Sequence, residues 1–331
     1  MNRSGKIHAL LSTARVANIP SVVSNVWLGV AVWGILNFNY GQGYIPEILW
    51  WDVSRLIFAG ISLYVGGNFL NDWSDREWDS QHRPERALPK GLFTPVLYRN
   101  VALIFGATGV LLASSVNWPA GVVSMIIASC IVIYTIWHKR SAWAVIPMGL
   151  CRGFLPVMGA LGMMEMPVNS WNIGFLCLFA IFSVVAGAGL FCYIMGLSLQ
   201  ARYESRGQQP KSPRLPGILF LIAGVLMTLP FLFSGKSFFL SGKSVLLAFN
   251  GLIAYCVWLS LCRTWFRKPI SRHVSALLAG IPLLDWILLL PISLLLISEK
   301  PLVDPLSIAC FAIPPLAFIL ALLLQRLAPA T

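Results

Sequence analysis

Ten long apolar segments follow one another along this chain, and they restrict what it can fold into. Each has about 20 residues, the length with which an α-helix crosses the hydrocarbon core of a bilayer. Lipid offers the backbone no hydrogen bonds, so only helices and closed barrels span it, and apolar residues that run on without alternation favour helices. We therefore predict an all-α, polytopic membrane helix bundle that forms a single domain over 1–331. It would have ten spans, or nine if one segment is re-entrant or lies in the interface: 17–36, 54–72, 97–115, 118–137, 142–163, 172–199, 214–234, 244–263, 273–298 and 305–327.

The distribution of charge predicts the orientation. The chain is 57% hydrophobic and carries a net charge of +12. If the N-terminus is cytoplasmic, nineteen of the 24 basic residues fall in the tails and loops of that side. Cytoplasmic loops carry an excess of Lys and Arg, so we predict a multi-pass protein of the cytoplasmic (inner) membrane with its N-terminus inside. Contact with anionic membrane lipids accounts for the charge, and the sequence contains no nucleic-acid-binding motif.

An acidic stretch, NDWSDREWD (71–79), directly follows the second apolar segment. If the second helix continues past residue 72, spacings of three and four bring its carboxylates and amides to one face. Carboxylates stacked in this way repel one another, and a divalent cation would neutralise them. Carboxylate and amide oxygens suit Mg²⁺ or Ca²⁺, not zinc. Mg²⁺ takes only one or two protein carboxylates and completes its octahedron with water and phosphate. The pattern predicts half of a metal–phosphate site, with these candidate ligands: Asn68, Asn71, Asp72, Asp75 and Asp79.

A basic loop, SQHRPERALPKG (80–91), comes next. It carries Arg83, Arg86 and Lys90 among prolines and a glycine that shape the chain. Guanidinium groups bind phosphate oxygens in bidentate geometry. An acidic helix end followed by a basic loop is therefore what a complex of metal and diphosphate requires. Pairing of the loop with itself and with lipid head groups is the alternative.

These motifs resemble those of a known family. NDWSDREWD matches the NDxxDxxxD motif of the UbiA superfamily of intramembrane prenyltransferases, and RPERALPKG (83–91) resembles its RPxRPLPxG. YTIWHKR (134–140) resembles the segment that ends its fourth helix, and MGLCRGFLPVMG (148–159) resembles its glycine-rich fifth helix. The resemblance implies a helical bundle around a central cavity. There an isoprenyl diphosphate binds through the cofactor Mg²⁺, its diphosphate departs, and an acceptor captures the allylic cation. It also implies phosphate contacts at Lys139.

The second acidic motif of the family is substituted in this chain. CYIMGLSLQARYES (192–205) begins with Tyr193 as in the family, but Ile194, Ala201 and Ser205 stand where aspartates are expected. Glu204 and Arg202 then remain as candidates, Glu204 to hold a metal and Arg202 to contact phosphate directly. A pocket that binds without ionising its ligand is the third possibility. YIMGLSLQARYE (193–204) resembles the UbiA-like branch encoded in Ebo gene clusters.

Two charges lie inside apolar segments. Arg152 and Asp285 would be costly at bilayer depth unless they face a cavity or a partner. We expect Arg152 to contact diphosphate, or to pair with Asp285 or another polar group. Asp285 could instead be a base that activates the acceptor. Asn25 could face the cavity or bond between helices. We interpret His82 and His138 as ordinary loop histidines, since neither is spaced as a metal ligand.

The function that the sequence predicts is a Mg²⁺-dependent prenyltransferase, which moves an isoprenyl group from its diphosphate to an unidentified small or lipophilic acceptor. The predicted catalytic residues are Asp72, Asp75, Asp79 and Glu204. The predicted diphosphate contacts are Arg83, Arg86, Lys139, Arg152, Arg202 and Tyr193. A membrane terpene cyclase and a non-catalytic isoprenoid- or lipid-binding protein are the alternatives.

Overall fold

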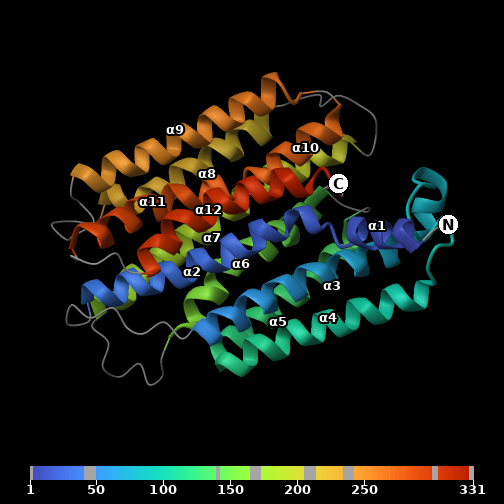
Figure 1. The fold of residues 1–331 in the computed structure, drawn as a ribbon, viewed down its shortest axis with the longest axis horizontal. Coiled ribbons are helices and arrows are strands. Elements are labelled where there is room, and N and C mark those ends of the chain that lie inside the picture. The colour runs from blue at the N-terminus through green and yellow to red at the C-terminus, as the bar shows by residue number, and fades with distance from the viewer. Residues whose placement is uncertain are drawn as a thin grey trace.

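The computed structural model is a bundle of helices (Figure 1). It describes residues 3–40, 50–138, 142–164, 173–204, 214–233, 242–267, 269–299 and 305–327, and this part of the chain contains no β-strand. Ten stretches of it are long and apolar enough to cross a membrane, and they coincide with the ten predicted spans to within a few residues, apart from the second, which is longer. The all-α prediction is confirmed, and the ten candidate spans agree with the predicted nine or ten.

The helices follow the order of the apolar segments, with short extra helices at the ends of spans. Their bounds are α1 (Arg3–Thr13), η1 (Val16–Asn18), α2 (Ile19–Tyr40), α3 (Trp50–His82), α4 (Pro95–Val116), α5 (Trp118–Trp137), η2 (Ala142–Ala144), α6 (Val145–Gly162), α7 (Ile173–Glu204), α8 (Arg214–Phe233), α9 (Gly242–Thr264), α10 (Ile270–Ala279), α11 (Ile281–Glu299) and α12 (Pro305–Leu324). One predicted span, 273–298, is thus built from α10 and α11, which meet at Gly280.

Helix α2 forms the centre of the bundle. It packs against α3, α6, α7, α11 and α12, and Figure 1 shows it running between α8 and α9 on one side and α4 and α5 on the other. Its side chains are buried around most of its circumference, including Val22, Trp27 and Leu36. A helix that is apolar all round is typical of a buried position. Helix α4 has only one buried face and turns the remainder outward, toward lipid.

Small residues bring α2 and α6 into backbone contact. A Cβ atom on Gly29 would lie 1.9 Å from the carbonyl oxygen of Pro156, and one on Gly159 would lie 2.2 Å from the carbonyl oxygen of Val26. Membrane helices associate largely through such close packing at small residues. This contact holds the polar residues of α6 beside α2.

Helix α3 continues well beyond the predicted end of its span at residue 72. It reaches His82 without a break, so the condition for the acidic residues to share a helix face is met. The chain then turns through a loop in which Gly91 has a φ of +66°, and Thr94 caps α4 by accepting a hydrogen bond from the backbone N–H of Leu97 at 3.3 Å. The loop of residues 83–94 therefore returns next to the acidic end of α3.

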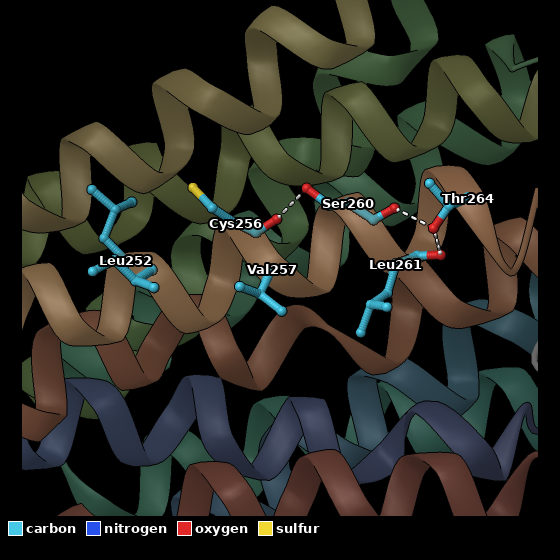
Figure 2. A pocket seen from close by; sticks show the side chains of 7 residues that line it. Leu252, Cys256, Val257, Ser260, Leu261 and Thr264 are labelled. Carbon is cyan, nitrogen blue, oxygen red and sulfur yellow. Dashed lines mark hydrogen bonds between the residues drawn. The ribbon is translucent and has the colours of Figure 1, made fainter.

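The outer face of α9 carries a shallow hollow (Figure 2). Its hydroxyl groups bond back to their own helix: Ser260 donates to the carbonyl of Cys256 at 2.9 Å, and Thr264 to that of Ser260 at 3.0 Å. Such bonds satisfy the hydroxyls locally. Ile253 and Val257 are more than half exposed. This surface is suited to lipid rather than to a polar ligand.

Candidate functional site

A cavity of about 460 Å³ opens where the ends of several helices meet. Its wall on α3 extends from Gly60 to Asp79, about 28 Å at 1.5 Å per residue. The inner part is lined by apolar side chains such as Leu63, Ile127 and Leu155, and the mouth by polar ones. Arginines from three parts of the chain line it: Arg15, Arg83, Arg86 and Arg152. The cavity therefore combines a charged mouth with an apolar interior.

Two carboxylates of α3 face the cavity. Asp75 and Asp79 both line it and are 7% and 2% exposed. Their spacing of four residues stacks them on one helix face. The third predicted carboxylate, Asp72, is half-buried beside them, and its Oδ1 accepts a hydrogen bond from Arg86 at 3.2 Å. The structure thus brings the three predicted aspartates to one place, with two of them directly on the cavity wall.

Arg86 links two of these carboxylates. Its Nη1 lies 3.2 Å from Asp72 Oδ1 and 2.9 Å from Asp79 Oδ2. Burial by itself lowers the pKa of Arg86, but the charges of Asp72 and Asp79 outweigh it and raise that pKa above its ordinary value. The guanidinium stays charged. In this structure it neutralises the acidic face, while it also lines the cavity where a phosphate could reach it.

His138 belongs to the site, and the interpretation as an ordinary loop histidine is wrong. It caps the C-terminus of α5 and lines the cavity. Its Nε2 lies 3.1 Å from Asp75 Oδ2, and its Nδ1 lies 3.1 Å from the carbonyl oxygen of Thr135. Its position immediately before Lys139, in the segment that resembled the family, was the signal in the sequence. His82 is exposed and stacks on Trp78, with ring centroids 4.1 Å apart.

Arg152 lies in the cavity wall and in a polar network between helices. It is 7% exposed, and its Nη1 donates to Ser21 Oγ and to Asn25 Oδ1, both at 3.1 Å. The amide of Asn25 in turn donates to Asp285 Oδ2 at 2.8 Å, and Ser24 Oγ donates to the same oxygen at 2.5 Å. Arg152 therefore reaches the cavity and is joined to Asp285 through Asn25, while its contact with diphosphate stays a prediction.

The wall formed by α7 is largely apolar. Ile194, Leu197, Ser198 and Ala201 line the cavity. Tyr193 points elsewhere: it is fully buried, and its hydroxyl donates to the carbonyl of Leu277 in α10 at 2.6 Å. Successive residues of a helix face directions about 100° apart, which turns Tyr193 away while Ile194 faces the cavity. The prediction that Tyr193 contacts diphosphate is not supported by this geometry.

The oxygen atoms of α3 suit a divalent cation. Asn71 Oδ1 and Asp79 Oδ1 are buried and have no hydrogen-bond partner among the described residues, although buried polar atoms are normally paired. Asn68 lines the cavity and donates from its amide to the carbonyl of Ala14 at 3.1 Å. Within the described residues, no group of three or more His, Cys, Asp or Glu side chains is arranged to hold a metal ion. The fit is that of an incomplete site, which matches a Mg²⁺ ion that takes part of its shell from water and phosphate.

Three predicted residues cannot be placed in the site. Lys139 lies outside the described residues. The backbone of α7 continues through Arg202 to Glu204, but the described side chains of that helix end at Ala201. The roles predicted for these three residues stay predictions.

Comparison with known families decides what kind of protein this is. Residues 27–269 match the model of the UbiA prenyltransferase family, which is well over half of the chain. The chain belongs to this family. It is accordingly an integral, multi-pass membrane protein, and the acidic face of α3 and the loop after it lie within the matched region.

Curated relatives within the family align over limited stretches. The digeranylgeranylglyceryl phosphate synthase of Thermococcus sibiricus is 36% identical over 92 residues, which cover 26% of this chain and 30% of the synthase. The synthase of the same name from Ignicoccus hospitalis is 29% identical over 143 residues, 43% of this chain and 42% of the synthase. The chain thus spans less than half of the length of these relatives.

Solved UbiA structures share the fold. A structure described as a digeranylgeranylglyceryl phosphate synthase in membranes matches 87% of this chain and 97% of its own, with a TM-score of 0.57 and 17% identity. The apo structure of a UbiA homologue from Aeropyrum pernix K1 matches 83% of this chain and 97% of its own, with a TM-score of 0.57 and 15% identity. The arrangement of helices around the cavity is therefore that of UbiA proteins.

Proposed function

We propose that this protein transfers an isoprenyl group from an isoprenyl diphosphate to a lipophilic acceptor, with Mg²⁺ as cofactor. The observation that carries the proposal is the division of one cavity into a mouth with paired acids and arginines and an apolar interior within the bilayer. A diphosphate with a long apolar tail has the same two parts. The UbiA family match supports the same reaction class.

The residues of the mouth would bind the head group. Asp75 and Asp79, with Asn71, would hold Mg²⁺, which supplies positive charge to the departing diphosphate. Arg83 and Arg86 lie where their guanidinium groups can bind phosphate oxygens. Binding of this kind helps the reaction because it stabilises charge that develops as the diphosphate leaves. We also retain Asp72, Lys139, Arg202 and Glu204 as proposed contributors.

The apolar interior of the cavity would control how the allylic cation reacts. The bond between the first isoprenyl carbon and the diphosphate oxygen breaks, and its electron pair leaves with the diphosphate. The acceptor then forms a bond to that carbon and loses a proton. Apolar side chains such as Leu63, Ile127 and Leu155 exclude water that would otherwise capture the cation. Since the curated relatives are named for digeranylgeranylglyceryl phosphate, we propose a glyceryl phosphate lipid as one acceptor to test.

The orientation belongs to the same proposal. Arg15, the loop after α3, and the ends of α5 and α7 all meet at the cavity mouth, and Figure 1 places α1, α10 and both termini toward the same end of the bundle. With the excess of basic loops on that side, we propose that the mouth opens to the cytoplasm from the inner membrane. Reporter fusions after residue 92 and after residue 117 would test this, because only the former would lie inside the cell.

Release of diphosphate is the direct test of the activity. Purified protein would be incubated with geranyl, farnesyl and geranylgeranyl diphosphates, with Mg²⁺ or with EDTA. We expect Mg²⁺-dependent release that falls about 100-fold or more in Asp75→Asn. Glu77→Gln is the matched control, because it removes the same charge from α3 at a side chain that is 85% exposed.

Product analysis separates the remaining possibilities. A prenylated acceptor supports transfer, whereas a cyclised hydrocarbon or alcohol formed without an acceptor would indicate a terpene cyclase. Binding of the diphosphate without its release from any donor would contradict the proposed reaction and favour a binding protein.

A further inference from the structure

We propose that this cavity takes a single divalent cation with its diphosphate, held on the α3 side, and that the face of α7 formed by Ile194, Leu197, Ser198 and Ala201 contributes no ligand for a second. The proposal rests on the proposed function, since it concerns the same ligand. It specifies how the substituted second motif changes the site.

The α7 wall presents one helix face to the cavity. Ile194, Leu197, Ser198 and Ala201 are spaced by three, one and three residues, so they share that face. Ile194 is only 2% exposed and packs into the core around the cavity. Among the described side chains on this face, the hydroxyl of Ser198 is the polar group, and it has no hydrogen-bond partner there. A hydroxyl can bind a phosphate oxygen, but it is a poor substitute for the carboxylate that Mg²⁺ requires.

The α3 wall has the opposite character. Asp75 and Asp79 present carboxylates to the cavity, and the amide oxygen of Asn71 lies on the same face. The oxygens Asp79 Oδ1 and Asn71 Oδ1 are buried without a partner, which is unfavourable until something binds them. A cation at this wall would satisfy both. These oxygens can serve one cation that also takes ligands from water and diphosphate.

The charges around the cavity favour a cation that enters with the diphosphate. Asp72, Asp75 and Asp79, together with Asp285 behind Arg152, balance the four arginines that line the cavity. A bound diphosphate therefore brings uncompensated negative charge to a largely buried site, and burial of uncompensated charge is costly. A divalent cation on the α3 wall offsets that charge.

Arg152 provides positive charge away from the α3 acids. It enters from α6 and is held by Ser21 and Asn25 of α2. Its guanidinium lies 5.1 Å from the centre of the Tyr64 ring, at a distance typical of a cation–π contact. A fixed arginine can bind diphosphate oxygens directly without an acidic ligand set. The proposed site therefore has a metal on one wall and a guanidinium deeper in the cavity.

Counting bound Mn²⁺ tests the proposal without a turnover assay. Full-length protein in detergent would be titrated with Mn²⁺ in the presence of geranyl S-thiolodiphosphate, a slowly reacting analogue, and free Mn²⁺ would be measured by electron paramagnetic resonance. We expect one tightly bound Mn²⁺ per chain, and none in Asp75→Asn. The double variant Ile194→Asp/Ala201→Asp should bind two, provided that its thermal unfolding shows that it is folded. The single variant Ala201→Asp adds one carboxylate at a half-buried site, so it disturbs the packing less than the double variant does.

Each outcome has a definite meaning. Two bound Mn²⁺ in the unmodified protein, reduced to one in Glu204→Gln, would overturn the proposal and assign the second ion to Glu204, while the proposed function would stand. If the folded double variant still binds one Mn²⁺, the α7 face does not limit the number and the argument is refuted. If the protein binds neither the analogue nor Mn²⁺, both this proposal and the proposed function fail.

Discussion

The buried network around Asp285 leads to a prediction about stability. Asp285 is fully buried within the span formed by α10 and α11, and it accepts hydrogen bonds from Ser24 and Asn25 of α2 at one carboxylate oxygen. The amide of Asn25 joins it to Arg152 of α6. Asp285 thus connects α11 to α2 directly and to α6 through Asn25, and it lies near the buried charge of Arg152. We expect Asp285→Leu to destabilise the protein.

The size of the effect follows from the bonds that are lost. Leucine leaves two buried donors unpaired, at about 1–3 kcal/mol each, although interhelical hydrogen bonds measured in a membrane average only about 0.6 kcal/mol. The membrane value gives about 1 kcal/mol for the two bonds, and the upper value for unpaired donors gives about 6 kcal/mol. We therefore expect a loss of roughly 3 kcal/mol, between these bounds. At about 2 °C per kcal/mol for a chain of this size, the unfolding temperature should fall by about 6 °C.

A double-mutant cycle tests whether Asp285 balances Arg152. Thermal unfolding in detergent would be followed for Asp285→Leu, Arg152→Met and the double variant, with Asp285→Asn as the isosteric control. Asparagine keeps one acceptor oxygen, so its effect should be intermediate. We expect the double variant to lose less stability than the sum of the single variants, by more than about 1 kcal/mol. Additive losses, or an Asp285→Leu protein as stable as the original, would refute the reasoning.

Two further predictions concern the helix contacts that build the cavity. Gly159→Ala should lower the unfolding temperature through about 1–3 kcal/mol of overpacking, because its Cβ would press on the carbonyl of Val26. Gly106→Ala, where a Cβ meets nothing within 4 Å, is the control, and equal effects would contradict the packing argument. Asn117→Ala should cost about 1–2 kcal/mol, since Asn117 caps α5 through the N–H of Ala120 at 3.0 Å and donates to carbonyls at the end of α6. Asn117→Asp keeps the cap but loses the bonds to the α6 carbonyls, so it should recover part of that loss in the same thermal assay. If it recovers none, the loss comes entirely from the bonds to α6.

Much of the site could be predicted because its residues are neighbours in sequence. Asn68, Asn71, Asp75 and Asp79 occur at helical spacing, so a continuous helix necessarily brings them to one face. The loop that follows α3 has few residues in which to return, which keeps Arg86 near the acids. The substitutions at Ile194 and Ala201 could also be recognised, since both residues occupy positions of a motif.

Contacts between distant segments could not be predicted in the same way. His138 was misinterpreted because its partner, Asp75, is 63 residues away in the chain. Tyr193 was assigned to the site from its place in a motif, while helix rotation turns it toward α10. The single domain over 1–331 and the resemblance to the Ebo-cluster branch stay predictions.

The sequence by itself determined the membrane bundle, the positions of its apolar spans and the acidic face of α3. These properties depend on local hydrophobicity and on the period of the helix, which the order of residues contains directly. Only the tertiary structure decided that Asn25 joins Arg152 to Asp285, that His138 meets Asp75 and that an apolar face of α7 opposes the acids. Those relations depend on how each helix is rotated about its axis and packed against others, and hydrophobic patterns are weak guides to rotation in a bundle whose helices are apolar on nearly every side.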